Sequence, residues 1–268
     1  MTAIQVSNLH KNFAQLKVLE GINFTIQPGE GVVLLGANGC GKSTLMRCLN
    51  GLETPSQGKI SMQEQSLHGM SNKQLRHLRK HIGVVFQQFN LVNNLSVFQN
   101  VLFGALGHYR LGLLKVWEPL ASSEDRDRAL ECLERVGLAE KASSRCQDLS
   151  GGQQQRVAIA RMLMQEPAII LADEPVASLD PRAGKEVMDL LWDIVQEKGL
   201  TLLCTLHQLE LVREYGDRVL GLKAGKVALD AAVSDLHQEQ LLQLYQTDPG
   251  EKASTHQSPQ PILSSLST

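Results

Sequence analysis

The chain has 268 residues, of which 43% are hydrophobic and 4% aromatic, a composition for one large or two small domains with an ordinary core. Its 26 basic and 28 acidic residues leave a net charge of −2, so there is no basic excess to favour nucleic acid as the main partner. The five cysteines form no C-x-x-C pair and the eight histidines show no metal-ligand spacing, so we expect inert thiols in a reducing cytosol.

No stretch of the sequence predicts a leader or a membrane span. The first five residues lack the charged start and apolar run of a signal peptide. The longest apolar runs have about six residues, against the roughly 20 that a membrane helix needs. We therefore expect a soluble protein, or one attached to a membrane only through a partner.

Two strands separated by turns are predicted at the N-terminus. Residues 3–9 and 22–26 have the composition of strands, and Phe13 lies in the turn-rich link between them. The dipeptide Pro28-Gly29 predicts the turn that follows the second strand. The chain is expected to enter its next strand directly from this turn.

A glycine-rich loop of the form G-x-x-x-x-G-K-[ST] then lies between an apolar strand at 32–35 and a helical segment at 45–50. Glycines let backbone N–H groups close around phosphate oxygens, and the following helix points its positive dipole end at the same anion. Lys42 adds a charge for the β- and γ-phosphates, and Ser43 offers a hydroxyl to Mg²⁺. The predicted triphosphate-binding residues are Gly36, Ala37, Asn38, Gly39, Cys40, Gly41, Lys42, Ser43 and Thr44.

The middle of the chain is predicted to be mostly helical. A basic helix is expected at 72–81, and a short strand at 82–86 ends at Gln87. Residues 124–136 predict an amphipathic helix, whereas residues 104–119 carry leucines and aromatics with few polar residues to solvate them. This second segment is either a surface that faces a partner or an ordinary packed helix. The apolar face of the amphipathic helix consists of Ala129, Leu130, Leu133 and Val136.

A second helix start has the character of an anion site. The sequence Leu-Ser-Gly-Gly-Gln at 149–153 opens a helix that runs to about Met164, with Ser150 as its N-cap. The N–H groups at Gly151 and Gly152 can bind an anion at this helix start. One triphosphate cannot easily be held by this site and by the glycine-rich loop within one chain.

Two carboxylates follow a strand that is expected to be buried on both faces. The apolar run at 168–172 has the length of a parallel strand and is followed by Asp173 and Glu174. In this position Asp173 would hold Mg²⁺ through water. Glu174 would orient and deprotonate the attacking water.

A helix and a buried strand complete this half of the chain. Asp180 is the predicted cap of a helix that begins at Pro181 and ends at Gly199, and a strand at 200–206 ends at His207. The buried stripe of the helix consists of Val187, Leu190, Leu191, Ile194 and Val195.

The C-terminal part predicts two short strands and a tail. The strands are expected at 218–222 and 227–229. Beyond about residue 248 the composition changes to Ser, Gln, Pro and Thr, which predicts disorder. We therefore expect one domain at 1–247 and a polar tail at 248–268.

In their order along the chain, these motifs resemble those of ATP-binding cassette (ABC) ATPases, from about residue 3 to 240. The resemblance implies an α/β P-loop NTPase fold with a mixed β-sheet core, an N-terminal antiparallel β subdomain and a helical subdomain at about 88–165. It implies that Phe13 stacks on adenine, that Gln87 senses Mg²⁺ and the attacking water, and that His207 contacts the γ-phosphate. The remaining matches are the signature residues Ser150, Gly151, Gly152 and Gln153, the metal and base carboxylates Asp173 and Glu174, and Asp180 in the loop that crosses the dimer.

The resemblance also implies cofactors and partners. ATP and Mg²⁺ are expected, with each ATP between the glycine-rich loop of one chain and the signature of a second copy in a head-to-tail dimer. Closing such a dimer does work only if another subunit moves, so transmembrane permease subunits are implied, and indirectly a solute-binding protein. We expect a peripheral protein on the cytoplasmic face of the inner membrane that binds no nucleic acid.

Within the family the chain is similar to the ATPases of phosphonate importers, although Ala37-Asn38 stands where that group commonly has Pro-Ser. ATPases that serve carriers of phosphite or hypophosphite would look similar. Two alternatives stay open: import of another small solute such as methionine or a polar amino acid, or a soluble ABC protein acting in translation or DNA repair. The similarity rests on residues 86–92, 95–97, 100–107, 134–137 and 206–208 and on the insertion at 108–123.

Overall fold

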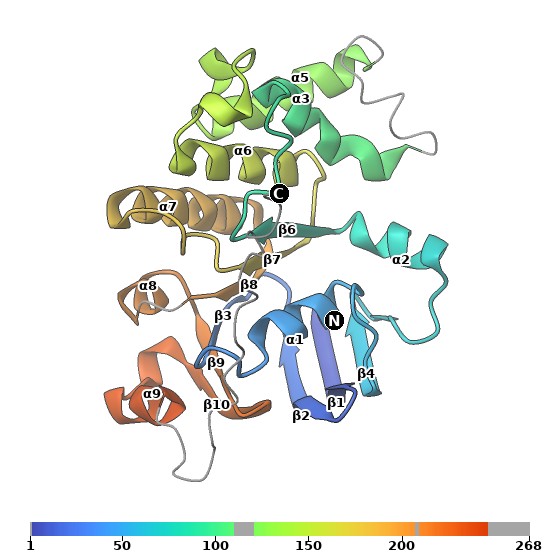
Figure 1. Ribbon diagram of the computed structural model, residues 1–268, viewed down its shortest axis with the longest axis vertical. Coiled ribbons are helices and arrows are strands. Elements are labelled where there is room, and N and C mark those ends of the chain that lie inside the picture. Colours follow the sequence, from blue (N-terminus) through green and yellow to red (C-terminus); the bar gives the residue numbers. More distant parts are fainter. Residues whose placement is uncertain (1, 110–120, 207–208, 246–268) are drawn as a thin grey trace, which may run out of the picture.

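The structure, a computed structural model, describes residues 2–109, 121–206 and 209–245, the side chains of residues 209 and 210 excepted. Figure 1 shows two β-sheets in these parts of the chain, with helices around them. One sheet is antiparallel and the other mixed, as the sequence predicts for an α/β protein with an antiparallel β subdomain. Among the described residues, no helix is long and apolar enough to cross a membrane.

The antiparallel sheet is built from the N-terminal strands, which alternate buried and exposed residues because successive side chains point to opposite faces. Ile4, Val6 and Leu9 are buried in this way. The first strand is longer than predicted and includes Phe13 as its last residue. In spatial order the strands are β2 (Leu16–Ile26), β1 (Ile4–Phe13), β4 (Gln57–Met62) and β5 (Gln65–Ser66).

The mixed sheet forms the centre of the molecule. Among the strands that the structure describes, β6, β7, β8, β3 and β9 pair with their neighbours in parallel, and β10 pairs antiparallel with β9. Val33 and Leu35 point into one hydrophobic core and Val32 and Leu34 into the other, so this sheet separates two cores. In spatial order the strands are β6 (Ile82–Phe86), β7 (Ile169–Asp173), β8 (Thr201–Thr205), β3 (Gly31–Leu35), β9 (Arg218–Lys223) and β10 (Lys226–Ala232).

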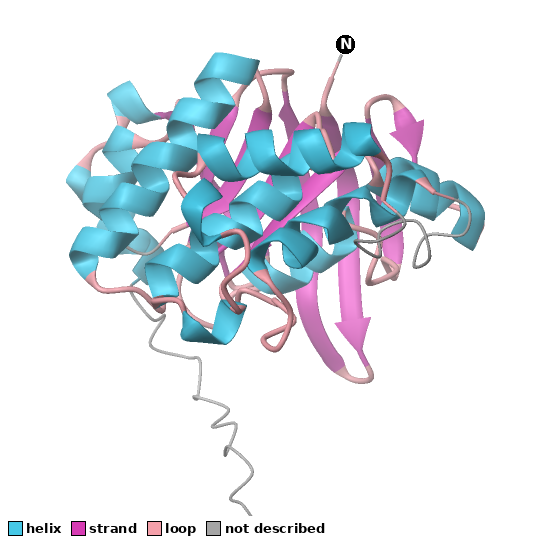
Figure 2. Ribbon diagram, turned by 90° about the horizontal axis from the view of Figure 1, so that it is seen from above, coloured by secondary structure: helices cyan, strands magenta, loops and turns pink. Residues whose placement is uncertain are grey.

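Helices cover the strands from one side in Figure 2 and form a group of their own at one end of the molecule in Figure 1. That group contains α3 (Val97–Leu102), α5 (Ser123–Arg135) and α6 (Gly151–Leu163), which pack on one another. This is the helical subdomain that the sequence predicts. The other helices are α1 (Lys42–Leu49), α2 (Asn72–Arg79), α7 (Pro181–Lys198), α8 (Leu209–Glu214) and α9 (Gln238–Tyr245), with short 3-10 turns at η1 (Phe103–His108), η3 (Ala139–Lys141), η4 (Cys146–Asp148) and η5 (Val233–Asp235).

The predicted helix ends are confirmed in detail. Gly51, Gly137 and Gly199 each follow a helix with a positive φ, the conformation that glycine adopts without strain. Ser150 and Asp180 cap α6 and α7 through their side-chain oxygens. Local sequence signals therefore fix the boundaries of these helices.

Some predictions about the helices were wrong or incomplete. Leu130, placed on the buried face of α5, is 40% exposed, because it lies one residue from Ala129 and so about 100° around the helix, while Cys132 takes the buried position. Helices α8 and α9 were not predicted. His207, most of the insertion at 108–123 and the tail at 248–268 lie outside the described residues.

Candidate active site

Part of the predicted site, the glycine-rich loop with Gln87, Asp173 and Glu174, lies at one edge of the mixed sheet. Strands β3, β6, β7 and β8 run in the same direction, so their carboxyl ends share this edge. The glycine-rich loop follows β3, Gln87 follows β6, and Asp173 and Glu174 come at the end of β7. Segments that are far apart in the sequence therefore supply one site.

Backbone geometry explains the glycines at both ends of the loop after β3. Gly36 has a φ of 146°, and a Cβ on it would lie 2.2 Å from the carbonyl oxygen of Leu222. Gly41 has a φ of 111°, and a Cβ on it would lie 2.7 Å from Cδ2 of Leu19. A side chain at either position would collide with a neighbouring strand, so glycine allows the loop to lie against β9 and β2.

Lys42 is buried inside its own loop. Its ammonium donates to the carbonyl oxygens of Gly36 at 2.9 Å and Ala37 at 3.3 Å, and only 5% of the residue is exposed. Both acceptors are neutral, whereas a buried cation is stabilised best by an anion. Helix α1 begins at Lys42 with Gly41 at its N-cap and, within the described structure, without a side-chain cap, which leaves first-turn N–H groups for a ligand. These donors fit a phosphate group.

The remaining loop residues surround this buried lysine. Asn38, Gly39 and Ser43 are exposed, so a ligand can reach them from solvent. Cys40 is buried, and its burial raises the pKa of its thiol more than the charge of Lys42 lowers it. A thiol with a raised pKa stays mostly protonated near neutral pH, which disfavours reaction at Cys40 despite its position inside the glycine-rich loop.

The carboxylates at the end of β7 are organised by a threonine on the next strand. Thr205 Oγ1 donates to Asp173 Oδ1 at 3.0 Å and accepts from the Glu174 N–H at 2.6 Å. Glu174 has a φ of 51°, a left-handed conformation that costs a non-glycine residue about 1–3 kcal/mol. Such strain is typical of functional sites, and here the threonine holds the strained residue from the strand side.

Gln87 lies at the same edge, beside the loop that precedes α7. Its side chain is exposed, and its carbonyl oxygen accepts from Ser178 Oγ at 3.3 Å. Asp180 closes that loop by accepting from the N–H of Ala183 at 3.0 Å. The structure thus brings Gln87 together with the predicted cross-dimer loop, although the two are about 90 residues apart in the chain.

The signature residues form the start of α6. Ser150 Oγ accepts from the Gln153 N–H, and Gln153 Oε1 accepts from the Ser150 N–H, which makes a capping box. A Cβ on Gly151 would lie 3.1 Å from Leu179, and one on Gly152 would lie 3.2 Å from Ala183. Small residues are needed here because α6 packs closely on the start of α7.

The structure does not bring the signature to the glycine-rich loop of the same chain. Figure 1 shows α6 among the helices at one end of the molecule, whereas α1 lies beside the antiparallel sheet, with β6 and β7 between them. The two predicted anion sites are therefore separate parts of one chain.

The predicted adenine-stacking residue and the predicted Mg²⁺ ligands have the exposure and the atoms that these roles require. Phe13 is 42% exposed at the end of β1, and the Lys11 ammonium lies 4.6 Å from its ring centroid, so one face of the ring is covered. Oxygen atoms of the kind that Mg²⁺ prefers are present on Ser43, Gln87 and Asp173. In the described ranges no three His, Cys, Asp or Glu side chains form a metal cluster.

Two organising residues were missed by the sequence analysis. Thr205 was read as part of an apolar strand, although a polar residue at the carboxyl end of a buried strand is a usable signal. Gln155 is fully buried on α6 and donates to backbone carbonyls near Gln87 and Glu174. Only the fold shows what these side chains contact.

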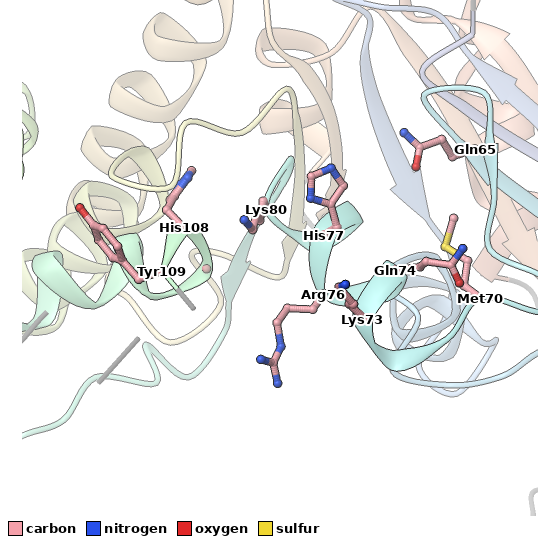
Figure 3. A pocket seen from close by; sticks show the side chains of 10 residues that line it. Gln65, Met70, Lys73, Gln74, Arg76, His77, Lys80, His108 and Tyr109 are labelled. Carbon is pink, nitrogen blue, oxygen red and sulfur yellow. The ribbon is translucent and has the colours of Figure 1, made fainter. Parts of the chain in front are cut away.

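A basic cleft of about 530 Å³ lies away from this edge, between α2 and η1. Figure 3 shows Lys80 and His77 between His108 and Tyr109 on one side and Gln65 and Met70 on the other. None of the described residues that line it is acidic. Burial, and then the charges of His77, His108 and Lys80, lower the pKa of the neighbouring His81. The cleft thus carries a positive field, and its lining consists of Gln65, Met70, Lys73, Gln74, Arg76, His77, Lys80, Gly107, His108 and Tyr109.

The sequence of this chain is similar to those of several known proteins, all of one family. The profile of the ABC transporter family matches residues 19–177. A phosphonates import ATP-binding protein, PhnC, of Frankia casuarinae is 49% identical over 93% of this chain and 98% of its own length. A second PhnC, of Oceanobacillus iheyensis, is 45% identical over 91% of this chain and 96% of its own. The hypophosphite import ATP-binding protein HtxD of Stutzerimonas stutzeri is 44% identical over 96% of this chain and 74% of its own.

Solved structures show the same similarity in three dimensions. CbiO1 of Clostridium perfringens, part of the ABC transporter complex cbiONQ, is 35% identical with a TM-score of 0.78, covering 90% of this chain and 92% of its own. The ATP-binding cassette MJ0796, a dimer in a post-hydrolysis state bound to ADP and Pi, is 34% identical with a TM-score of 0.73, covering 86% of this chain and 98% of its own.

Proposed function

The chain belongs to the ABC transporter family of ATP-binding proteins, and we propose that it hydrolyses ATP to drive an importer of phosphonates or related reduced-phosphorus anions. The observation that supports hydrolysis best is the meeting, at one sheet edge, of a buried lysine in a glycine loop and a strained glutamate. Lys42 and the N–H groups of the first turn of α1 bind the phosphates. Glu174 accepts a proton from the attacking water.

Mg²⁺, when bound, supplies positive charge against the phosphates, and the residues that would hold it are Ser43, Gln87 and Asp173. Thr205 orients the Asp173 carboxylate through the bond at 3.0 Å. The exposed Gln87 side chain lies beside the path of the attacking water, and His207 contacts the γ-phosphate in this proposal. Phe13 stacks on the adenine with the ring face that Lys11 leaves open.

The active form is a head-to-tail dimer of two copies of this chain. Because α6 and the glycine-rich loop are separate within one chain, a single copy offers each nucleotide only half of the donors. The second copy adds Ser150, Gly151, Gly152 and Gln153 from its signature, and Asp180 from the loop before α7. A dimeric relative bound to ADP and Pi supports this arrangement.

Glu174→Gln tests the role of the base and the dimer together. We expect this isosteric change to reduce the ATP hydrolysis rate by about a hundredfold or more while ATP binding persists. A closed dimer should then accumulate at saturating ATP and Mg²⁺ in analytical ultracentrifugation. Glu166→Gln is the matched control, because Glu166 also has a positive φ of 53° but lies at the amino end of β7. A monomer of the Glu174 variant at saturating ATP would argue against the proposal.

The cargo is proposed from the names of the relatives. Relatives that cover more than 90% of this chain at 44–49% identity are named for phosphonate import, and one is named for hypophosphite import. Both names describe anions of reduced phosphorus. Uptake of a radiolabelled phosphonate in cells with and without this chain would test the assignment, and unchanged uptake would contradict it.

Transmembrane permease subunits are the proposed partners, on the cytoplasmic face of the inner membrane, with a solute-binding protein acting through them. Residues 104–109 are the described part of the segment for which partner contact and ordinary packing are the alternatives, and three of them, Gly107, His108 and Tyr109, line the basic cleft beside α2. Lys73, Arg76 and Lys80 are spaced along one face of α2 and its end, and they favour an acidic segment of the permease. Lys73 and Arg76 are exposed, and a free small anion is the weaker choice because an exposed ion pair contributes little by itself, whereas an acidic segment can pair with several of these side chains at once.

Charge reversal tests this docking surface. The pair Lys73→Glu and Arg76→Glu should reduce co-purification with the permease subunits, and reduce uptake, while isolated ATPase activity stays unchanged. Lys59→Glu, at an exposed residue of β4, is the control with the same change of charge per residue. Undiminished assembly of the double variant would exclude the cleft as the docking surface.

A further inference from the structure

One buried amide links the helix that begins with the signature to the backbone on either side of the catalytic edge. Gln155 lies in the second turn of α6 and is 0% exposed. Its Nε2 donates to the carbonyl oxygen of Pro175 at 2.6 Å and to that of Phe86 at 3.3 Å. Phe86 immediately precedes Gln87, and Pro175 immediately follows Glu174. A single side chain of α6 therefore contacts both segments that present site residues.

The partners of Gln155 fix the orientation of its amide. Both are carbonyl oxygens, which only accept hydrogen bonds, so the NH₂ group must face them. The oxygen Oε1 is consequently left in the interior without a partner among the residues that the structure describes. A buried polar atom without a partner lowers stability, so stability alone does not account for glutamine at this position.

The backbone at Glu174 needs support from both sides. Its φ of 51° is a strained conformation, and such strain persists only where neighbouring contacts hold it. Thr205 Oγ1 accepts from the Glu174 N–H on the strand side at 2.6 Å. On the other side Gln155 binds the carbonyl of the next residue, Pro175, at 2.6 Å. The two contacts together hold the peptide unit that precedes the glutamate and the peptide unit that follows Pro175, one residue beyond it.

We propose that Gln155 is a positioning residue that couples the signature helix to the hydrolysis site of its own chain, an inference that rests on the proposed function. The N-terminus of α6 contacts the nucleotide held by the other copy in the dimer. A shift of α6 on that contact is passed through the Gln155 amide to the carbonyl groups beside Gln87 and Glu174. Each hydrolysis site thereby depends on whether the signature of the same chain is engaged.

The test compares two glutamines that bind opposite ends of strand β6: Gln155 binds the carbonyl of Phe86, and Gln165 binds the carbonyl of Ile82. Gln155→Met keeps the length of the side chain and removes the donor. Gln165→Met is the matched control, because the Gln165 amide, just after α6, donates to the carbonyls of Arg79, Lys80 and Ile82 near the amino end of β6. Gln155→Met should lower kcat for ATP hydrolysis by about tenfold to a hundredfold, the scale expected when a catalytic group is misplaced by about 1 Å. Gln165→Met should leave kcat within about threefold of the wild type.

A second readout separates positioning from a structural role. In the Glu174→Gln background, Gln155→Met should still form the ATP-bound dimer, because the phosphate-binding groups are intact. Loss of the dimer together with kcat would show that Gln155 only maintains the fold, and an unchanged kcat would equally overturn the proposal. If Gln155→Met does not fold, Gln155→Glu is measured instead, with the same expected loss, and failure of both to fold would mark the residue as structural.

The proposed function and this inference fail in different ways. Comparing ATP hydrolysis by the wild type with that by Lys42→Ala tests the ATPase assignment independently of any change at Gln155. A wild-type chain that does not hydrolyse ATP would contradict the proposed function. A wild-type chain that does, with Gln155→Met at the same kcat, would contradict only the inference.

Discussion

Helices α1 and α6 both begin with a glycine-rich sequence that predicts an anion site, yet the two helix starts are built differently. At α1 the N-cap is Gly41, in a left-handed conformation and, among the described residues, without a side-chain cap. At α6 the N-cap is Ser150, and its hydroxyl and the Gln153 amide satisfy two N–H groups of the helix start. Only α1 has a buried ammonium next to it, from Lys42, within the described structure.

This difference indicates which of the two helix starts can bind an anion without help from a second chain. The loop before α1 has a cation and open N–H groups, so it is a complete phosphate site in one chain. The start of α6 is already stable in the free chain, because its capping box replaces part of what a ligand would supply. It is suited to contact a nucleotide that is held elsewhere, which is the reason to expect a second copy.

Lys42→Ala should have the largest effect on this comparison. Removing the buried ammonium takes away the charge that distinguishes α1 from α6, and ATP hydrolysis should fall by about a hundredfold to a thousandfold. Turnover of ATP in a coupled phosphate-release assay measures this directly. Lys59→Ala, an exposed lysine on β4, should keep the wild-type rate. A Lys42 variant with wild-type turnover would remove the phosphate-site assignment.

Gly36→Ala should have the second largest effect, through the fold of the loop. The new Cβ would meet the Leu222 carbonyl oxygen at 2.2 Å, so we expect a loss of stability of about 3 kcal/mol or more. Gly39→Ala in the same loop also has a positive φ, of 79°, but open space around it, and should cost about 1 kcal/mol. Urea unfolding of both variants measures the difference, and equal losses would show that backbone conformation, not contact with β9, sets the requirement for Gly36.

Ser150→Ala should have the smallest effect on stability and a separate effect on hydrolysis. Loss of the cap should reduce the free energy of unfolding by about 1 kcal/mol. Ser71→Ala is the matched control, because Ser71 and Gln74 form the same capping box at α2. Both variants should lose similar stability, but only Ser150→Ala should lower hydrolysis, by about tenfold. Equal hydrolysis in both would mean that the start of α6 is only a helix cap.

Local signals predicted much of the fold and of the site. The strand–loop–helix order around Lys42, the caps at Ser150 and Asp180 and the glycines after three helices depend on neighbouring residues, which a single sequence displays. The apolar face of α5 was only partly right, because burial of Cys132 rather than Leu130 depends on how the helix is rotated against α3 and α6. Helices α8 and α9 were not predicted, although α1 and α2, which like α9 have eight residues, were.

By itself, the sequence determined which residue types the site contains and which backbone positions need glycine, since both follow from chemistry within a few residues of each motif. Only the tertiary structure decided the rest: that Thr205 organises Asp173 and Glu174, that Gln155 links α6 to that edge, and that α1 and α6 stay apart. These relations join residues that are tens of positions apart in the chain. They exist only once β6, β7 and β8 pair side by side, because pairing in the sheet sets which strand ends are neighbours.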